Sequence, residues 1–173
     1  GMIGRKVCEL LRPFDVKVIA YDPFVSAGDA QALGAELVSL EELFKRSDVV
    51  TLHTPWLKET EGMITGEHFR SMKQGASFIN TSRGAVVNQP EMLEVLRERT
   101  DLFVVLDVTY PEPPEPGSEV FHFPNIILTP HIAGSMDNEC RRMGRYMVEE
   151  LQRYLNGEPL RWGLTKEKAA IMA

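Results

Sequence analysis

Strands and helices alternate along this chain, and the alternation restricts its fold more than any other sequence feature. Runs of apolar, β-branched and aromatic residues predict strands over residues 16–21, 35–38, 48–53, 77–81, 102–108 and 126–129. Helices are predicted between them, over residues 5–11, 39–46 and 88–99, with Ser39 and Asn88 as N-caps. Continuous apolar strands are typical of a parallel sheet buried on both faces. The sequence therefore predicts a doubly wound, mostly parallel α/β domain, in which ligands bind at the carboxyl ends of the strands.

A longer helix is predicted from residue 135 to just before Gly157, which is followed by Pro159. An apolar stripe at three- and four-residue spacing runs along it: Met136, Cys140, Met143, Met147, Leu151 and Leu155. We interpret this stripe as core or as a contact between subunits, in preference to a methionine-rich functional surface.

Composition excludes several classes of protein. The 173 residues carry a formal charge of −6, and they contain no basic stripe, so we expect no nucleic-acid partner. No run approaches the roughly 18 unbroken apolar residues of a membrane span, and no signal-peptide pattern opens the chain, so no membrane association is expected. Cys8 and Cys140 are too few for a disulfide scaffold or, by themselves, a metal site. Two reduced thiols in a cytoplasmic protein are the favoured interpretation.

The first candidate site combines glycines with an acidic residue. Gly1 and Gly4 precede a short helix, and Asp22 follows the strand at 16–21. An acidic residue at the end of the second strand, about 20 residues beyond the glycines, accepts the ribose hydroxyls in dinucleotide-binding folds. The alternative is that Asp22 and Pro23 form only a turn. A carboxylate here repels a 2′-phosphate, which favours NAD over NADP.

The glycine pattern is also incomplete. The fingerprint G-x-G-x-x-G needs another glycine two residues before Gly1, and a strand before that glycine. We therefore expect a Rossmann-type domain that lacks its usual first strand, because the chain is cut inside the phosphate-binding loop. In an alternative interpretation, Gly1 and Met2 are a tag remnant and a start methionine. The predicted organisation is a dinucleotide-binding domain over residues 1–157, incomplete at its N-terminus, a tail over 158–173, and no substrate domain.

Side chains that can bind an anion or transfer a proton follow three further strands. Arg83 follows the strand at 77–81, Glu112 follows that at 102–108, and His131 follows the last one. Each has an ordinary explanation when taken singly, as a surface arginine, a solvated glutamate or a capping histidine. Together at the strand ends of one sheet, they have the parts for acid–base chemistry on a 2-keto or 2-hydroxy acid.

Six stretches in order make a specific resemblance: GMIGR, VIAYDP, LHTPWLKET, GASFINTSRGAVVN, VVLDVTYPEPP and NIILTPHIAG. The chain resembles the NAD-binding domain of the D-isomer-specific 2-hydroxyacid dehydrogenases, the family that includes D-3-phosphoglycerate, glycerate/hydroxypyruvate and D-lactate dehydrogenases. The resemblance implies that Arg83 binds the substrate carboxylate and polarises its carbonyl. It implies that His131 is the general acid in reduction and the base in oxidation, with Glu112 bonded to its imidazole.

The resemblance also implies a cofactor site for NAD(H). Asp22 would hold the adenosine ribose, and Asp107 would anchor the nicotinamide carboxamide. The remaining cofactor-binding residues implied are Gly1, Met2, Ile3, Gly4, His53, Thr54, Pro55, Thr60, Thr81, Ser82, Ala133 and Gly134. No metal ligand is implied.

Two positions depart from the family pattern. Trp56 and Leu57 stand where Leu-Thr is usual, and we interpret Trp56 as an interface or substrate-cleft contact. Asp15 replaces the usual glycine before the second strand, which is tolerable because aspartate visits the left-handed conformation more readily than most residues. Neither departure touches the residues implied to be catalytic.

The favoured hypothesis is an NAD-dependent oxidoreductase of D-2-hydroxy acids and 2-keto acids, of which this chain supplies the NAD-binding and acid–base half. Alone, the chain is expected to have little or no activity, because half of the cleft is absent. The alternative is a non-catalytic dinucleotide-binding regulatory or interaction module derived from the same family. A methyltransferase with the same sheet architecture is disfavoured, because Arg83, Glu112 and His131 would then have no joint role in the reaction. A cytoplasmic homodimer is expected, since loss of a central strand leaves apolar surface to cover.

Overall fold

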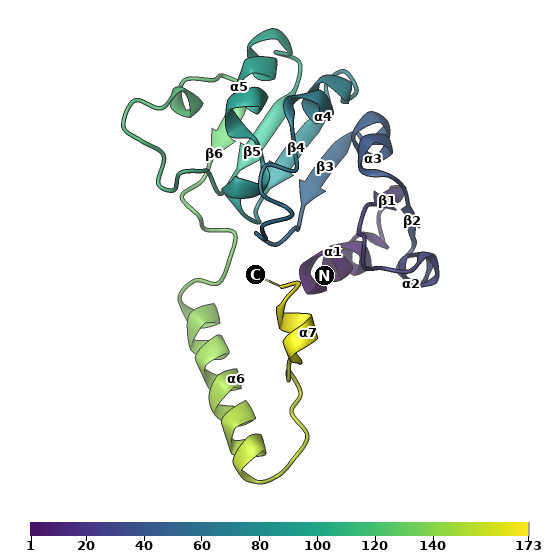
Figure 1. Ribbon diagram of the computed structural model, residues 1–173, viewed down its shortest axis with the longest axis vertical. Coiled ribbons are helices and arrows are strands. Elements are labelled where there is room, and N and C mark those ends of the chain that lie inside the picture. Colours follow the sequence, from purple (N-terminus) through teal and green to yellow (C-terminus); the bar gives the residue numbers. More distant parts are fainter. Residues whose placement is uncertain (173) are drawn as a thin grey trace.

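The computed structural model describes residues 1–172 and contains two parallel sheets (Figure 1). A two-stranded sheet pairs β1 with β2, and a four-stranded sheet has the order β3-β4-β5-β6. The strands are β1 (Val18–Ala20), β2 (Ala35–Leu37), β3 (Val49–Leu52), β4 (Ser77–Asn80), β5 (Phe103–Leu106) and β6 (Ile126–Leu128). All six lie inside the predicted ranges, and the predicted α/β class with a parallel sheet is confirmed.

The helices connect these strands in sequence. Their bounds are α1 (Met2–Leu11), α2 (Ala27–Ala32), α3 (Leu40–Arg46), α4 (Gly66–Ser71), α5 (Gln89–Glu98), α6 (Asn138–Leu155) and α7 (Lys166–Ala169), with 3₁₀ turns η1 (Gly84–Val86) and η2 (Glu119–Phe121). Ser39 caps α3 by accepting the Glu42 amide, and Asn88 caps α5 by accepting the Glu91 amide. Both predicted N-caps are therefore confirmed. The short helices α2 and α4 had no prediction in the sequence.

The two sheets are separate in the part of the chain that the structure describes. In the order 3-2-1-4-5-6 the first strand lies between the second and the fourth. Here β1 and β2 correspond to the second and third strands, and β3 corresponds to the fourth. Within residues 1–172 no strand pairs with both β1 and β3, so the sheet is interrupted at the place that the first strand takes in that order.

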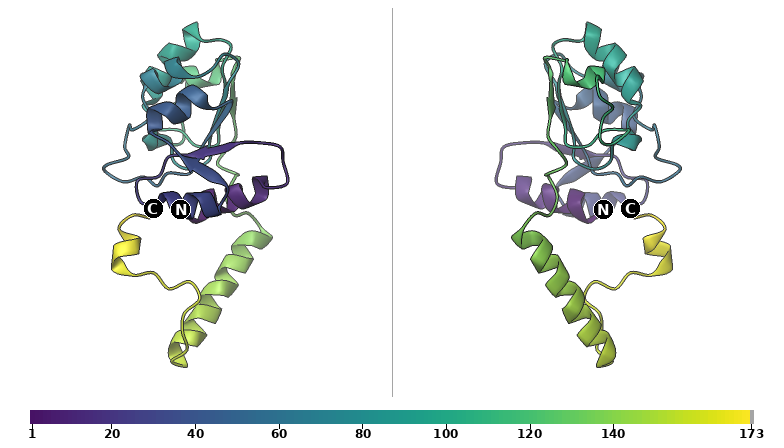
Figure 2. Two further views of the ribbon diagram at one scale, coloured as in Figure 1. Left: turned by 90° about the vertical axis from the view of Figure 1, so that its right-hand side faces the viewer. Right: turned by 90° about the vertical axis from the view of Figure 1, so that its left-hand side faces the viewer.

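The main core lies on one face of the four-stranded sheet. Alternate strand residues such as Val50, Phe78 and Val104 are buried against Phe44 of α3 and Phe69 of α4, together with the apolar face of α5. Figure 2 shows α3, α4 and α5 together on that side of the strands. The opposite face is uncovered: Val49 is 56% exposed, Phe103 53% and Ile127 57%. The prediction of strands buried on both faces is therefore wrong for this sheet, because no helix of residues 1–172 packs on its second face.

Helix α6 projects away from the sheets (Figures 1 and 2). None of its residues is buried, and the predicted stripe is exposed along its length, with Met143 at 54% and Leu151 at 57%. The interpretation of the stripe as core is therefore wrong within this chain, and the subunit contact stays a prediction. Within residues 1–172, no helix combines the length and apolar composition needed to cross a bilayer.

Candidate active site

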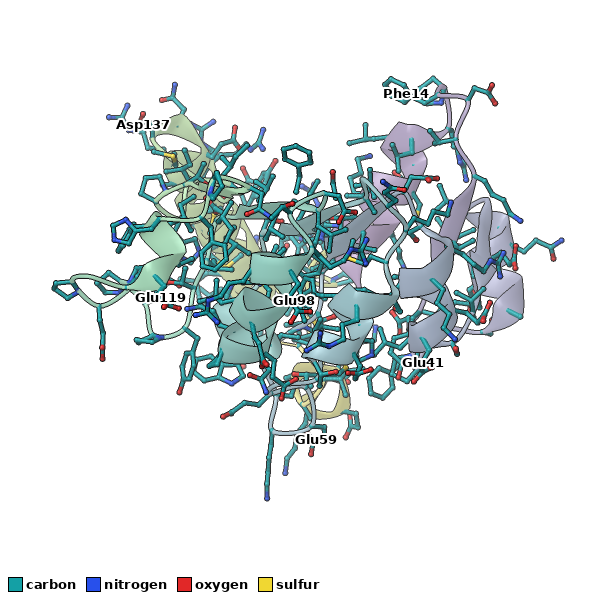
Figure 3. The ribbon with its side chains drawn as sticks, turned by 90° about the horizontal axis from the view of Figure 1, so that it is seen from above. Phe14, Glu41, Glu59, Glu98, Glu119 and Asp137 are labelled. Atoms are coloured by element: carbon teal, nitrogen blue, oxygen red, sulfur yellow. The ribbon has the colours of Figure 1, made fainter. Side chains whose placement is uncertain are left out.

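The carboxyl ends of β4, β5 and β6 lie level with one another at one edge of the sheet. The register pairs Asn80 with Leu106 and Leu106 with Leu128, so the three strands end side by side. The loops that follow them run through residues 81–83, 107–118 and 129–137. Viewed from above, Glu119 and Asp137, which lie at the far ends of the second and third of these loops, are on the same side of the molecule (Figure 3). Parallel topology therefore collects the predicted catalytic residues in neighbouring loops.

His131 and Glu112 are in direct contact. The Nδ1 atom of His131 lies 2.5 Å from Oε1 of Glu112, although 19 residues separate them in sequence. Both side chains are partly exposed, 46% for His131 and 38% for Glu112. A carboxylate beside Nδ1 accepts a hydrogen bond from the N–H group of that nitrogen, which leaves Nε2 as the reactive atom of the ring.

The backbone of His131 is unusual, since its φ is +54°. This left-handed conformation is uncommon for residues other than glycine and persists where surrounding contacts hold it. The contacts are made by Asp107, the first residue after β5. Its Oδ1 accepts hydrogen bonds from Thr129 Oγ1 at 2.5 Å and Ile132 N at 2.8 Å, and its Oδ2 accepts one from Ala133 N at 2.8 Å.

Asp107 is only 3% exposed. Burial by itself raises the pKa of this carboxyl, but the hydrogen bonds from Thr129, Ala133 and Ile132 outweigh burial and hold its pKa below the ordinary value. Asp107 is therefore an ionised carboxylate beneath the turn that carries His131.

Arg83 is exposed at the neighbouring strand end. Its Nη1 donates to the Ser82 carbonyl at 2.7 Å, and the buried Asn80 amide donates to the Arg83 carbonyl at 3.0 Å. The Asn80 Oδ1 also accepts from the backbone nitrogen and the hydroxyl of Ser82. The next residue, Gly84, packs directly against the Thr109 backbone. The backbone of Arg83 is thus fixed, and its exposed guanidinium, which makes one hydrogen bond to the Ser82 carbonyl, has further N–H donors that can bind an anion.

The cofactor candidates at the chain's beginning lie together. The Gly1 nitrogen is 3.4 Å from Oδ2 of Asp22, and the Asp22 Oδ1 accepts from Phe24 N. The first helical hydrogen bond of α1 runs from Arg5 N to Gly1 O, so the preceding amides are free of helical partners. Free amides at a helix N-terminus bind phosphate, and an adjacent carboxylate binds ribose hydroxyls, so the residues present fit a dinucleotide.

The segment after β3 forms a compact loop. Thr60 Oγ1 donates to the Pro55 carbonyl at 2.6 Å and accepts from Leu57 N at 2.8 Å, which ties the loop's two ends together. His53 at its start lies against Gly4 of α1, with its Cβ 3.9 Å from the position of a Cβ on that glycine, and burial lowers the His53 pKa. The loop therefore joins the dinucleotide candidates to the sheet.

Trp56 in the same loop stacks edge-on against Tyr110, with ring centroids 5.5 Å apart. Tyr110 stands two residues before Glu112, so the aromatic pair adjoins the His131 and Glu112 loops. Of the other predicted cofactor residues, Thr54 is half-buried, whereas Thr81 and Gly134 are exposed at the same edge.

Two polar residues at this edge, Asn80 and Thr129, were not among the predicted site residues. Both are polar residues at the ends of apolar strands: the Asn80 amide donates to the Arg83 carbonyl, and the Thr129 hydroxyl donates to Asp107. A polar residue that ends an otherwise apolar strand was the available signal, but strand-end positions also suit turn formation.

Free amides at the start of α1 beside the Asp22 carboxylate, together with the contact between His131 and Glu112, are features typical of nicotinamide-dependent dehydrogenases. Comparison with known proteins identifies the family within that class. Residues 1–133 match the model of the D-isomer specific 2-hydroxyacid dehydrogenase NAD binding domain. The chain belongs to this family, its matched domain is an NAD-binding domain, and the resemblance deduced from the six motifs is confirmed.

Individual relatives agree with this assignment. The chain is 34% identical over 161 residues to D-3-phosphoglycerate dehydrogenase of Archaeoglobus fulgidus, covering 93% of this chain and 31% of that protein. The structure of D-mandelate dehydrogenase of Rhodotorula graminis superposes with a TM-score of 0.83 at 32% identity, covering 96% of this chain and 49% of the other. D-lactate dehydrogenase with NAD⁺ from Lactobacillus jensenii gives a TM-score of 0.79 at 26% identity, covering 96% and 53%. The chain thus spans about a third to a half of the length of these relatives.

Proposed function

We propose that this chain is the NAD-binding and acid–base half of an oxidoreductase that transfers a hydride between NAD(H) and a D-2-hydroxy acid or 2-keto acid. The observation that supports it best is the 2.5 Å contact between His131 and Glu112, at the strand edge that also carries Arg83. Family membership supports the same chemistry.

In this proposal His131 moves the proton. Glu112 holds Nδ1, so Nε2 faces the reacting oxygen. In the reduction of a 2-keto acid, Nε2 of the imidazolium donates its proton to the carbonyl oxygen as that oxygen gains negative charge. In the oxidation of a 2-hydroxy acid, Nε2 of the neutral ring accepts the hydroxyl proton. The carboxylate of Glu112 stabilises the charged ring in both directions.

Arg83 binds the substrate carboxylate. Its planar guanidinium can donate two parallel hydrogen bonds to a carboxylate, which fixes the adjacent carbonyl in orientation as well as position. The Asn80 amide and the packing of Gly84 on Thr109 hold the Arg83 backbone. This geometry selects substrates in which a carboxylate is directly attached to the reacting carbon.

NAD supplies the hydride acceptor, and NADH the donor, when bound. Asp22 would accept hydrogen bonds from the adenosine ribose, and the free amides at the start of α1 would hold the pyrophosphate. A 2′-phosphate would meet the Asp22 carboxylate, so we propose NAD(H) as the preferred cofactor over NADP(H).

The 173-residue chain assayed alone is proposed to oxidise NADH very slowly with 2-keto acids. The Arg83 guanidinium and His131 ring are both exposed, and exposed groups neither exclude water nor hold a substrate tightly. We also propose that the protein forms a homodimer, which the exposed apolar stripe on α6 supports. The proposed location is the cytoplasm.

The proposed site can be tested by ternary binding. Oxamate, a 2-keto acid analogue that hydride does not reduce productively, is titrated into the chain saturated with NADH. We expect Arg83→Gln to weaken oxamate binding about tenfold or more without changing NADH binding, because a bidentate ion pair is lost. Arg97→Gln is the matched control, since Arg97 pairs with Glu119 on the surface of α5. Equal oxamate affinity in wild type and Arg83→Gln would contradict the assignment of Arg83.

A further inference from the structure

Asp107 is bonded entirely to the segment that carries His131. All three hydrogen bonds of its side chain come from residues 129–133: one from the Thr129 hydroxyl and two from consecutive backbone amides, Ile132 and Ala133. The carboxylate therefore holds this segment on both sides of the histidine.

The two amides form an anion-binding arrangement. His131 is left-handed, with φ of +54°, and this conformation turns the next two N–H groups toward the same point. Successive N–H groups beside a left-handed residue make a concave anion site in many proteins. Here the anion is internal, since the buried Asp107 carboxylate occupies that site.

We propose that Asp107 is a positioning residue for His131: its carboxylate fixes the left-handed turn and so holds the imidazole against Glu112. This inference rests on the proposed function for its catalytic meaning, but its structural content is independent of it. It differs from the carboxamide-anchoring role that the family resemblance implies, because it acts through the backbone of residues 129–133 and needs no bound cofactor.

The two roles predict different effects of Asp107→Asn. The side-chain amide of asparagine directs a donor toward one of the two backbone N–H groups, so at least one hydrogen bond is lost. If Asp107 positions His131, the turn loosens in the absence of NADH. If Asp107 serves only as a carboxamide anchor, the turn is unchanged and only NADH affinity falls.

Amide hydrogen exchange of Ile132 and Ala133, followed by NMR on the full 173-residue chain without cofactor, separates these outcomes. We expect the two amides to exchange about tenfold faster or more in Asp107→Asn than in wild type, because a hydrogen bond to a charged group is lost. The exchange rates of the core amides of β4 should not change. Asp101→Asn is the matched control. Asp101 lies at the other end of β5 and also accepts a backbone amide, from Gly75, but does not contact the His131 segment.

A spectroscopic readout tests the consequence for the imidazole. In wild type the ¹⁵N resonance of His131 Nδ1 should shift on Glu112→Gln, because the two groups are in contact. In the Asp107→Asn background the same substitution should produce no shift. A general loss of stability does not predict this loss of coupling, and the Asp101→Asn background should retain it.

If Asp107→Asn does not fold, variants of Thr129 test the same hydrogen-bonded arrangement. Thr129→Val removes one bond to Asp107 and should speed exchange at Ile132 and Ala133, whereas Thr129→Ser keeps the hydroxyl and should restore the wild-type rate. Wild-type exchange in both Asp107→Asn and Thr129→Val would overturn the inference. Failure of the chain to bind NADH or oxamate would overturn the proposed function while leaving the exchange result intact.

Discussion

Gly84 lies against Thr109 so closely that a β-carbon on this glycine would fall 2.0 Å from the Thr109 carbonyl oxygen. The backbone of the loop after β4 thus touches the loop after β5, immediately beside Arg83. Glycine is required here by contact and not by its conformational freedom. The Arg83 loop and the Glu112 loop are consequently held as one unit.

Gly84→Ala should therefore destabilise the chain. The obstructing atoms are backbone and cannot rotate away, so we expect a loss of at least about 3 kcal/mol in the free energy of unfolding, as for severe overpacking. Chemical denaturation followed by circular dichroism measures it. Gly144→Ala is the control: Gly144 lies within α6 with open space around it, so alanine should be neutral or improve the helix. Equal stability of Gly84→Ala and wild type would contradict the close contact.

Glu112→Ala should have little effect on stability. The His131–Glu112 pair is partly exposed on both sides, and exposed ion pairs contribute about 0–1 kcal/mol. We expect the free energy of unfolding to change by less than about 1 kcal/mol, while His131 populates both neutral tautomers instead of one. Imidazole ¹⁵N spectra report the tautomers, and a single unchanged tautomer in the variant would show that Glu112 does not orient the ring.

Asp101 predicts a specific pH dependence. Its hydrogen bonds from Arg99, and then from the Gly75 amide, hold its pKa far below the ordinary value. A carboxyl whose folded-state pKa is lowered contributes stability above its unfolded pKa, near about 4, and this contribution is lost as the pH falls further. Asp101→Asn should cost about 2 kcal/mol at pH 7 and progressively less below pH about 4. Unfolding curves from pH 7 to pH 3 test this, and a difference that does not change with pH would contradict it.

Asp22 should set the choice of cofactor. Asp22→Ala removes a charged acceptor for the ribose hydroxyls, so NADH affinity should fall about tenfold or more. NADPH affinity should rise, because the repulsion of its 2′-phosphate is removed. Fluorescence titrations with both nucleotides measure the two changes. Asp29→Ala, a change of another exposed carboxylate at the start of α2, should alter neither.

The features that the sequence predicted best depend on local patterns. The strands β3 to β6 are apolar runs bounded by polar residues. The side chains of Ser39 and Asn88 accept hydrogen bonds from backbone amides three residues further on, so these N-caps depend only on the local sequence. The sequence also allowed the prediction that Arg83, Glu112 and His131 lie at one edge of the sheet, because parallel strands bring their carboxyl ends together. These inferences need no knowledge of distant contacts.

The features that the sequence did not predict depend on tertiary context. An apolar run cannot show whether a helix is present to cover it, so Val49 and Phe103 were expected to be buried and are exposed. The amphipathic pattern of α6 indicates an apolar face, but the pattern does not show which surface, if any, covers that face. The hydrogen bonds from residues 129–133 to Asp107 depend on a left-handed conformation of His131, which is uncommon for any residue other than glycine and could not be assigned from the sequence.

If residues 1–133 form a working NAD-binding domain, the purified chain should bind NADH, and a titration with the nucleotide measures this. NADH is added to the purified chain while the nucleotide fluorescence is followed, with S-adenosylmethionine tested in parallel by calorimetry. We expect saturable binding of NADH at one site per chain and no binding of S-adenosylmethionine. Binding of S-adenosylmethionine without binding of NADH would contradict it.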